Sequence, residues 1–313
     1  MNRRQFVAAA AALPLVARDS ALAAVPTTAL VTCDTEARIA VVDLGRGRVV
    51  RSIATLPGPR SVERVSDRVA LVAHTALGAV SIVDAHGVRR VLKTFSEPRY
   101  AAAHPHGRYA FVTDSAHSDL FSVDVVRGAV VGRVRLEAWA RHVTIDARGT
   151  RLWVGLGTAE PVVALVDVAD PSRPRLVRYV RAPFGAHDVG FGASGIWVTS
   201  GDRRELAVYD RRGSLRSQLA AAAPPQHVTF ARDIAYVASG ADGELRVHAL
   251  DDGRVIRVTP VPVGSYNVQR GDGGLVVTPS LDRGTLTMLD PRGRMLRRIE
   301  VAGSCHDACF IAG

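Results

Sequence analysis

Several signatures of common protein classes are missing from this sequence of 313 residues. It has no Walker or Rossmann glycine motif, no G-x-S-x-G turn and no H-E-x-x-H helix, the usual marks of nucleotide binding, serine hydrolysis and zinc proteolysis. Aromatic residues make up 5% of the chain, which leaves little for the base-stacking surfaces that bind single-stranded nucleic acid. Beyond residue 23 no apolar run approaches the roughly 20 residues of a membrane-spanning helix. We therefore expect neither nucleic acid as a partner nor a membrane span in the mature protein.

Lysine is almost absent as well, because Lys93 is the only one among 40 basic residues. The formal net charge of +10 would attract anionic ligands, nucleic acid or membrane surfaces. However, the arginines are spread through turns rather than clustered, which favours a solvated surface over a polyanion-binding patch. The overall charge therefore carries little information about function.

The N-terminus has the pattern of an export signal. Arg3, Arg4 and Phe6 precede an apolar run over residues 7–17, and Ala21 and Ala23 follow at the spacing that signal peptidase requires. The pattern resembles a twin-arginine (Tat) signal, which exports folded proteins, and an ordinary secretory signal with a chance arginine pair is the alternative. Both predict removal of residues 1–23 and a periplasmic or secreted mature protein.

One motif recurs seven times along the rest of the chain. Each copy has a polar couplet followed by an apolar residue, then a second apolar run, then a third run that ends in a turn residue, as at residues 60–62, 71–73 and 82–84. Successive copies are offset by 39, 42, 46, 39, 40 and 40 residues, measured at Val62, Ala101, Val143, Val189, Val228, Val268 and Ala308. Short apolar runs with Gly or Asp turns indicate four strands in each copy, and this spacing is typical of propeller blades.

The seventh copy is split between the two ends of the chain. Its first strand lies at residues 306–310, and its other strands lie near residues 29–32 and 40–43. A blade shared in this way closes the ring and leaves no free sheet edge. The sequence therefore predicts an all-β domain over residues 28–313, a seven-bladed β-propeller with four-stranded blades and a closing blade shared by the N- and C-terminal strands.

Six third strands end in aspartate, a residue that hydrogen-bonds the backbone of tight turns. They end at Asp43, Asp84, Asp124, Asp167, Asp210 and Asp290. Six turns of one kind require six such residues, so we expect these carboxylates to be structural.

The second strands resemble those of the YVTN β-propeller repeat family, a WD40-like class of repeat. The matching segments are residues 111–115 (FVTDS), 197–201 (WVTSG) and 236–240 (YVASG), and the resemblance covers residues 28–313. The family includes lactonases of the phosphogluconolactonase type, surface-layer and periplasmic binding proteins, and propellers that support electron transfer. The chain has few asparagines at its strand turns and only a partial Pro-Asp-Gly hairpin, which leaves the subfamily open.

Polar residues form two columns where the first strand of each repeat begins, at the expected mouth of the central channel. The first column is Arg60, Arg99, Arg141, His187, Gln226, Tyr266 and His306. The second column is Ser61, Tyr100, His142, Asp188, His227, Asn267 and Asp307. A wet channel mouth explains this polarity without any function, and a ligand site on a rigid scaffold is the alternative. The residues that we expect to bind a ligand are Arg60, Arg99, Arg141, His142, His187, His227, Tyr266 and His306.

The residue types indicate what such a site would take. Guanidinium groups in three successive repeats suit carboxylates or phosphates. The leading prediction is a monomeric, exported binding or scaffold protein that captures a small anionic molecule or a protein partner at the channel mouth. The alternative, which the family resemblance implies, is a lactonase-type hydrolase; a metal-dependent enzyme on the same face is another. Candidate catalytic residues are His187 and His306.

The three cysteines, Cys33, Cys305 and Cys309, lie in the repeat that closes the ring. In an oxidising compartment, a disulfide from Cys33 to Cys305 or Cys309 would join the two ends of the chain. We favour Cys305, since both sulfurs would then lie at the exposed rim. A copper or zinc site formed by Cys33, Cys305, His306 and His74 is the competing prediction, and a metal ion is the only cofactor that the sequence suggests.

Overall fold

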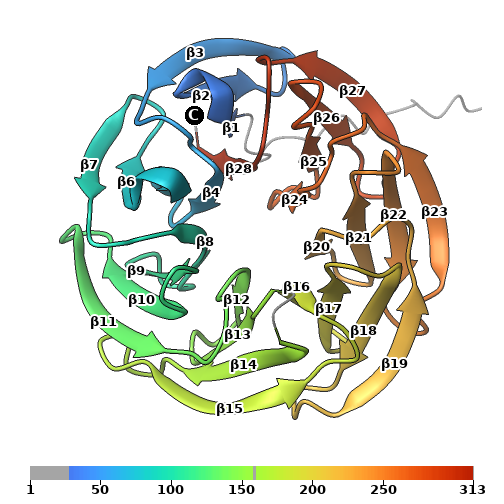
Figure 1. Cartoon of the computed structure of the whole chain (residues 1–313). Helices are drawn as coiled ribbons and strands as arrows, with labels where there is room; N and C mark the ends of the chain where they lie inside the picture. Colours follow the sequence, from blue (N-terminus) through green and yellow to red (C-terminus); the bar gives the residue numbers. More distant parts are fainter. Residues whose placement is uncertain (1–27, 158–159, 313) are drawn as a thin grey trace, which may run out of the picture.

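Seven four-stranded antiparallel sheets stand around a central axis like the blades of a propeller (Figure 1). The computed structural model describes residues 28–157 and 160–312, and the predicted export signal lies outside these ranges. The all-β, seven-bladed fold predicted from the repeats is confirmed. Within the described ranges, no helix is long and apolar enough to cross a membrane.

Each blade runs from the axis to the rim in four strands. The innermost strands are β28 (Ala308–Ile311), β4 (Ser61–Arg64), β8 (Pro98–Ala103), β12 (Val143–Ile145), β16 (Ala186–Phe191), β20 (His227–Phe230) and β24 (Gln269–Arg270). The second strands are β1 (Thr28–Cys33), β5 (Ala70–His74), β9 (Tyr109–Asp114), β13 (Arg151–Gly155), β17 (Ile196–Ser200), β21 (Ile234–Ser239) and β25 (Val276–Pro279).

The outer half of each blade follows the same order. The third strands are β2 (Arg38–Asp43), β6 (Ala79–Val83), β10 (Asp119–Asp124), β14 (Val162–Asp167), β18 (Glu205–Tyr209), β22 (Glu244–Ala249) and β26 (Thr285–Leu289). The outermost strands are β3 (Arg48–Ala54), β7 (Val88–Leu92), β11 (Ala129–Arg135), β15 (Arg175–Arg181), β19 (Leu215–Ala220), β23 (Val255–Pro260) and β27 (Met295–Glu300). Short 3-10 helices η1 (Asp34–Glu36) and η2 (Thr75–Leu77) follow β1 and β5.

The two ends of the chain meet in the closing blade. Strand β28 pairs antiparallel with β1, with Ala308 opposite Val31 and Ile311 opposite Thr28 (Figure 1). Backbone hydrogen bonds from Thr32 to Asp307 and from His306 to Thr32 continue this pairing toward the channel mouth. The ring therefore closes by strand pairing, without a free sheet edge at the seam.

The hydrophobic core lies between adjacent blades rather than at the axis. Trp153 on β13 packs against Ile196 and Tyr209 of the next blade, and Trp197 on β17 packs against Val228 of the blade after that. Apolar side chains are thus removed from water between the sheets, where their burial stabilises the fold. The innermost strands are left free to present polar side chains to the channel.

The repeated aspartates at the ends of the third strands are turn residues, as predicted. Asp84 accepts hydrogen bonds from the backbone N–H groups of His86 and Gly87, at 2.7 and 2.9 Å. Each of the other five accepts at least one backbone N–H in its own turn: Asp43, Asp124, Asp167, Asp210 and Asp290.

Candidate functional site

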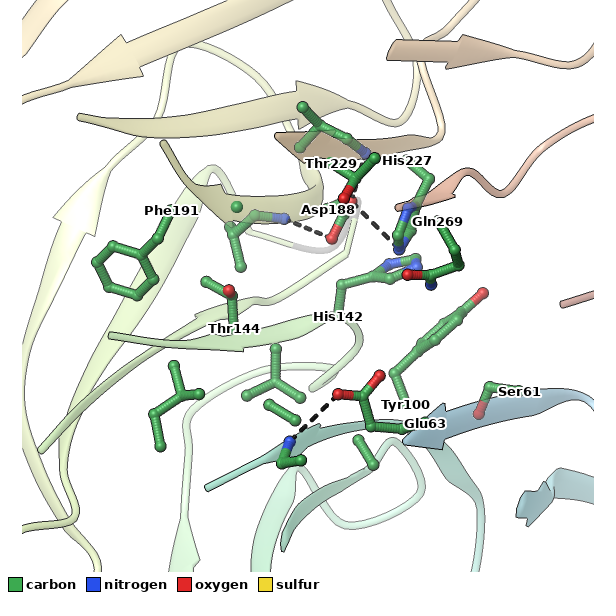
Figure 2. A pocket seen from close by; sticks show the side chains of 18 of the residues that line it. Ser61, Glu63, Tyr100, His142, Thr144, Asp188, Phe191, His227, Thr229 and Gln269 are labelled. Atoms are coloured by element: carbon green, nitrogen blue, oxygen red, sulfur yellow. Dashed lines mark hydrogen bonds and ion pairs between the residues drawn. The ribbon is translucent and has the colours of Figure 1, made fainter. Parts of the chain in front are cut away.

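Three cavities follow one another along the channel. The mouth cavity, of about 300 Å³, is lined by Arg60, Tyr100, Arg141, His187, Gln226, Tyr266, Asn267, Leu281 and His306. The inner cavity, of about 320 Å³, has among its polar residues Glu63, Tyr100, His142, Asp188, His227, Gln269 and Asp307 (Figure 2). A third cavity, of about 530 Å³, lies at the far end of the inner strands. Tyr100 lines the first two cavities and Glu63 lines the last two, so these side chains mark the boundaries.

The mouth cavity contains two arginines that lack a counter-charge. Arg60 and Arg141 form no ion pair with any carboxylate in the described part of the chain, and the Nε atom of each is buried without a hydrogen-bond partner. Burial lowers the pKa of Arg141, and the positive charges of Arg99 and Arg60 lower it further. Arginines on the outside of the ring differ: Arg216, for example, reaches Asp210 at 2.6 Å. The mouth cavity therefore contains two guanidinium groups that have no carboxylate partner and whose Nε atoms are shielded from water.

Arg99, the third arginine predicted to bind the ligand, is already engaged and does not line the mouth cavity. Its Nε donates to the Ser115 hydroxyl at 3.0 Å, and its guanidinium lies 3.5 Å from Glu97. The guanidinium groups of Arg99 and Arg141 lie over the ring of Trp139, at 4.9 and 5.2 Å from its centroid. Trp139, which the repeat pattern does not mark as a site residue, holds Arg141 in place by a cation–π contact.

The mouth histidines are neutral. Burial, followed by the charge of Arg60, lowers the pKa of His306 to about 3. Burial, followed by the charge of Arg141, lowers the pKa of His187 well below its ordinary value. Imidazoles with such low pKa values are weak bases at neutral pH, and neither adds a positive charge to the mouth.

Directly below the mouth, most of the second column forms what we call the staple layer: Ser61, His142, Asp188, His227, Asn267 and Asp307. Each of these side chains hydrogen-bonds the backbone of the next blade. Tyr100, the remaining member of the column, stacks on His142 with the ring centroids 3.6 Å apart. Much of the polarity that the sequence shows at the channel therefore serves to join neighbouring inner strands.

Two aspartates of the staple layer occupy equivalent positions. Asp188 accepts hydrogen bonds from its neighbour Val189 and from Val228 of the next blade, at 2.7 and 2.9 Å. Asp307 does the same across the seam, with Ala308 at 2.8 Å and Val62 at 3.0 Å. Burial raises the pKa of Asp307 to about 6.

Glu63 and Gln269 also face the inner cavity, although neither belongs to the two polar columns predicted from the sequence. Each follows a staple-layer residue by two positions on an inner strand, so the alternation of side chains in a β-strand would have placed them on the channel side. Glu63 accepts one hydrogen bond, from the backbone of Ala103 at 3.3 Å. Burial raises the pKa of Glu63 to about 8.

The structure brings together some of the residues predicted for the seam. Cys33 and Cys305 belong to one core cluster, in which the Cys33 thiol donates to the Val31 carbonyl at 3.7 Å, whereas Cys309 lies in a different cluster. All three are buried free thiols, so the expectation that Cys33 and Cys305 lie at the exposed rim is wrong. The disulfide itself stays a prediction, with Cys305 as the neighbouring partner in the same core cluster.

The predicted metal set of Cys33, Cys305, His306 and His74 does not converge. His74 is occupied by the Pro57 carbonyl at 3.2 Å and the Ser81 hydroxyl at 2.9 Å, and His306 faces the mouth cavity. Within the described ranges, the one group of three or more His, Cys, Asp or Glu side chains close enough to share a metal ion is His142, Asp188 and His227.

The fold and the channel define a seven-bladed β-propeller with an arginine-bearing channel mouth. No known family profile and no curated protein sequence matches the chain. Solved structures share its fold. Hydrazine synthase from Kuenenia stuttgartiensis has a TM-score of 0.76 at 15% identity, with 84% of this chain and 92% of that chain covered.

Two further structures are similar over most of their length. A protein of unknown function from Desulfotomaculum acetoxidans has a TM-score of 0.79 at 10% identity, covering 91% of this chain and 99% of that one. The dihydro-heme d1 dehydrogenase NirN, in complex with DHE, has a TM-score of 0.64 at 13% identity, covering 92% and 75% respectively. At these identities the similarity establishes the fold alone.

Proposed function

We propose that this protein is an exported β-propeller that binds a small anionic molecule in the mouth cavity. The observation that carries the proposal is the pair formed by Arg60 and Arg141, whose Nε atoms are buried without partners and whose charges no described carboxylate balances. A buried charge is unfavourable unless it is paired and hydrogen-bonded. A carboxylate or phosphate between the two guanidinium groups would supply both the opposite charge and the missing hydrogen-bond acceptors.

The rest of the mouth cavity suits the same ligand. Each hydrogen bond to a charged group contributes about 1.5–3 kcal/mol, and Trp139 holds Arg141 so that little side-chain freedom is lost on binding. Gln226, Tyr266 and Asn267 provide neutral polar groups, and the cavity volume of about 300 Å³ is at the lower end of the range for small-molecule sites. The ligand class is therefore a metabolite-sized carboxylate or phosphate.

Calorimetric titration with inorganic phosphate, succinate and citrate tests the proposal. We expect at least one of them to bind, and Arg60→Gln and Arg141→Gln each to weaken it tenfold or more, which is about 1.4 kcal/mol. Arg216→Gln, which removes the same charge from the outer surface, is the matched control and should change affinity less than twofold. Equal losses in all three variants, or no binding by the wild type, would contradict the proposal.

Arg99→Gln, measured in the same series, tests the role predicted for Arg99. Because Arg99 lies outside the mouth cavity and holds Ser115, we expect its replacement to weaken binding less than that of Arg141.

The hydrolase alternative ranks second, because burial leaves His187 and His306 as weak bases. Turnover of a lactone that is lost in His187→Ala or His306→Ala, with ligand binding retained, would reverse this order. The YVTN resemblance, which rests on segments such as residues 236–240, is compatible with both functions.

Export is the second half of the proposal and rests on Arg3, Arg4 and the apolar run that follows them. A precursor with both arginines changed to lysine should remain unprocessed in the cytoplasm, whereas the wild type should be recovered outside it, cleaved after residue 23. Normal export of the double-lysine precursor would rule out the twin-arginine route.

A further inference from the structure

The inner cavity contains a cluster of metal-ligand side chains that anion binding at the mouth does not use. His142 precedes β12, Asp188 lies on β16 and His227 begins β20, so the three come from successive blades at the same register. Their nearest ligand atoms all lie within 4.8 Å of one another, and His227 Nε2 is 3.7 Å from Asp188 Oδ2. Bonds of about 2.0–2.2 Å to one zinc ion place its ligands roughly 3–4 Å apart, so small side-chain shifts would complete the set.

Hydrogen bonds fix which nitrogen of each histidine faces the cluster. His142 Nδ1 lies 2.7 Å from the His187 carbonyl oxygen, and His227 Nδ1 lies 3.0 Å from that of Val268. A carbonyl oxygen only accepts, so both Nδ1 atoms carry a proton and donate it, and in the neutral imidazole Nε2 is then the atom with the lone pair. Metal-binding histidines are oriented by such bonds to backbone carbonyls.

One of these nitrogens has no partner. His142 Nε2 is buried and makes no hydrogen bond, although His142 is only 2% exposed. Buried polar atoms are nearly always paired, and an exception calls for an explanation such as an ion. The carboxylate of Asp188 is itself held by two backbone N–H groups, which keeps Oδ2 beside His227 (Figure 2).

We propose that His142, Asp188 and His227 bind a single divalent transition-metal ion inside the channel. Two imidazole nitrogens and one carboxylate are the ligand set of catalytic zinc sites and of non-haem iron(II) sites, both of which keep open coordination positions. Calcium and magnesium are excluded as the natural occupants because they prefer oxygen ligands throughout. The open positions would face the inner cavity, which meets the mouth cavity at Tyr100.

The molecule offers a matched control in Asp307, which makes the same two kinds of backbone hydrogen bond as Asp188. Its column neighbours are Asn267 and Ser61, whereas those of Asp188 are His142 and His227. Asp188→Asn and Asp307→Asn therefore disturb the staple layer equally but differ in what they remove from the metal site.

The test is a calorimetric titration of chelator-treated, dialysed protein with zinc chloride. We expect one zinc ion per chain with micromolar or tighter affinity, and a loss of more than 100-fold in His142→Gln, His227→Gln and Asp188→Asn. Asp307→Asn should stay within about threefold of the wild type, and thermal melting of each metal-free variant confirms that it folds.

Three outcomes would overturn the inference: no stoichiometric zinc binding by the wild type, undiminished binding by the three ligand variants, or equal losses in Asp188→Asn and Asp307→Asn. The result is independent of the anion site. Arg60→Gln and Arg141→Gln should keep the zinc affinity of the wild type, so failure of either proposal leaves the other standing.

Discussion

Two layers of the channel wall, the staple layer and the residues one position before it at the mouth, lie one residue apart in sequence and differ in how their charged side chains are paired. In the staple layer, nearly every side chain is bonded to the backbone of the next blade, as with Asp307 and Val62 at 3.0 Å. In the mouth layer, Arg60 and Arg141 keep buried Nε atoms without partners. Polarity around a propeller channel is therefore not by itself a sign of a binding site. The informative feature is a buried polar group that the fold leaves unpaired.

The seam of the ring should show the largest effect on stability. Oxidation of Cys33 and Cys305 would close a loop of nearly the whole chain and stabilise the fold by about 5 kcal/mol in the chain-entropy model. Thiol titration of the exported, denatured protein should find one thiol, and urea unfolding before and after reduction gives the free-energy difference. Three free thiols in that protein would contradict the prediction and leave closure to non-covalent contacts such as the pairing of β28 with β1.

The reduced protein allows the staple layer to be tested directly. Asp307→Ala leaves the N–H groups of Val62 and Ala308 buried without an acceptor, and each orphaned donor costs about 1–3 kcal/mol. We expect the free energy of unfolding to fall by roughly 3 kcal/mol in urea titrations. Arg60→Ala is the corresponding change at the mouth, one position before the staple layer. An equal loss of unfolding free energy in that variant would contradict the distinction between the two layers.

Glu63 is intermediate between the staple-layer aspartates, which accept two backbone hydrogen bonds each, and the unpaired mouth arginines. Its half-buried carboxyl group accepts one backbone hydrogen bond. Its pKa is about 8 in the folded protein and about 4.3 in an unfolded chain. The protonated carboxyl therefore stabilises the fold at low pH, and this contribution is lost as the pH rises toward 8 and beyond.

Replacement of Glu63 by glutamine removes this titration. Relative to the wild type, Glu63→Gln should become more stable by roughly 2 kcal/mol between pH 5 and pH 8.5, after allowance for solvent in the channel. Urea unfolding of both proteins at the two pH values measures the change. A constant difference between them would show that the Glu63 carboxyl titrates normally.

The smallest effect is expected at the mouth itself. In the absence of ligand, Arg141→Gln removes a buried charge that Arg99 and Arg60 repel, so the free energy of unfolding should rise by about 0.5–1 kcal/mol at low salt and by less at high salt. Arg99→Gln loses the contacts with Ser115 and Glu97 and should instead be slightly destabilising. If the free energy of unfolding changed in the same direction in both variants, the result would contradict an unpaired, destabilising charge at Arg141.

The ring could be predicted from the sequence because its causes are local and repeated. Offsets of 39 to 46 residues and aspartates such as Asp84 and Asp210 report strands and turns directly. The split repeat also predicts the pairing of β28 with β1, since a ring leaves the terminal strands no other partner.

The site was predictable only in outline. The first polar column of the repeats, which includes Arg60, Arg141 and His187, predicts that these residues meet at the channel mouth, and the three line one cavity. They could not separate Arg99 from Arg141, because the difference lies in contacts with Glu97 and Ser115 rather than in register. Likewise, the hydrogen bond that orients His142 is made with the His187 carbonyl of another blade, and no spacing along the chain reports it.

The most direct test of the central claim is a crystal structure of the protein with selenate, an anion that anomalous scattering locates. We expect an anomalous peak in the mouth cavity, within hydrogen-bonding distance of the guanidinium groups of both Arg60 and Arg141. Peaks confined to arginines on the outer strands, with none at the mouth, would contradict it.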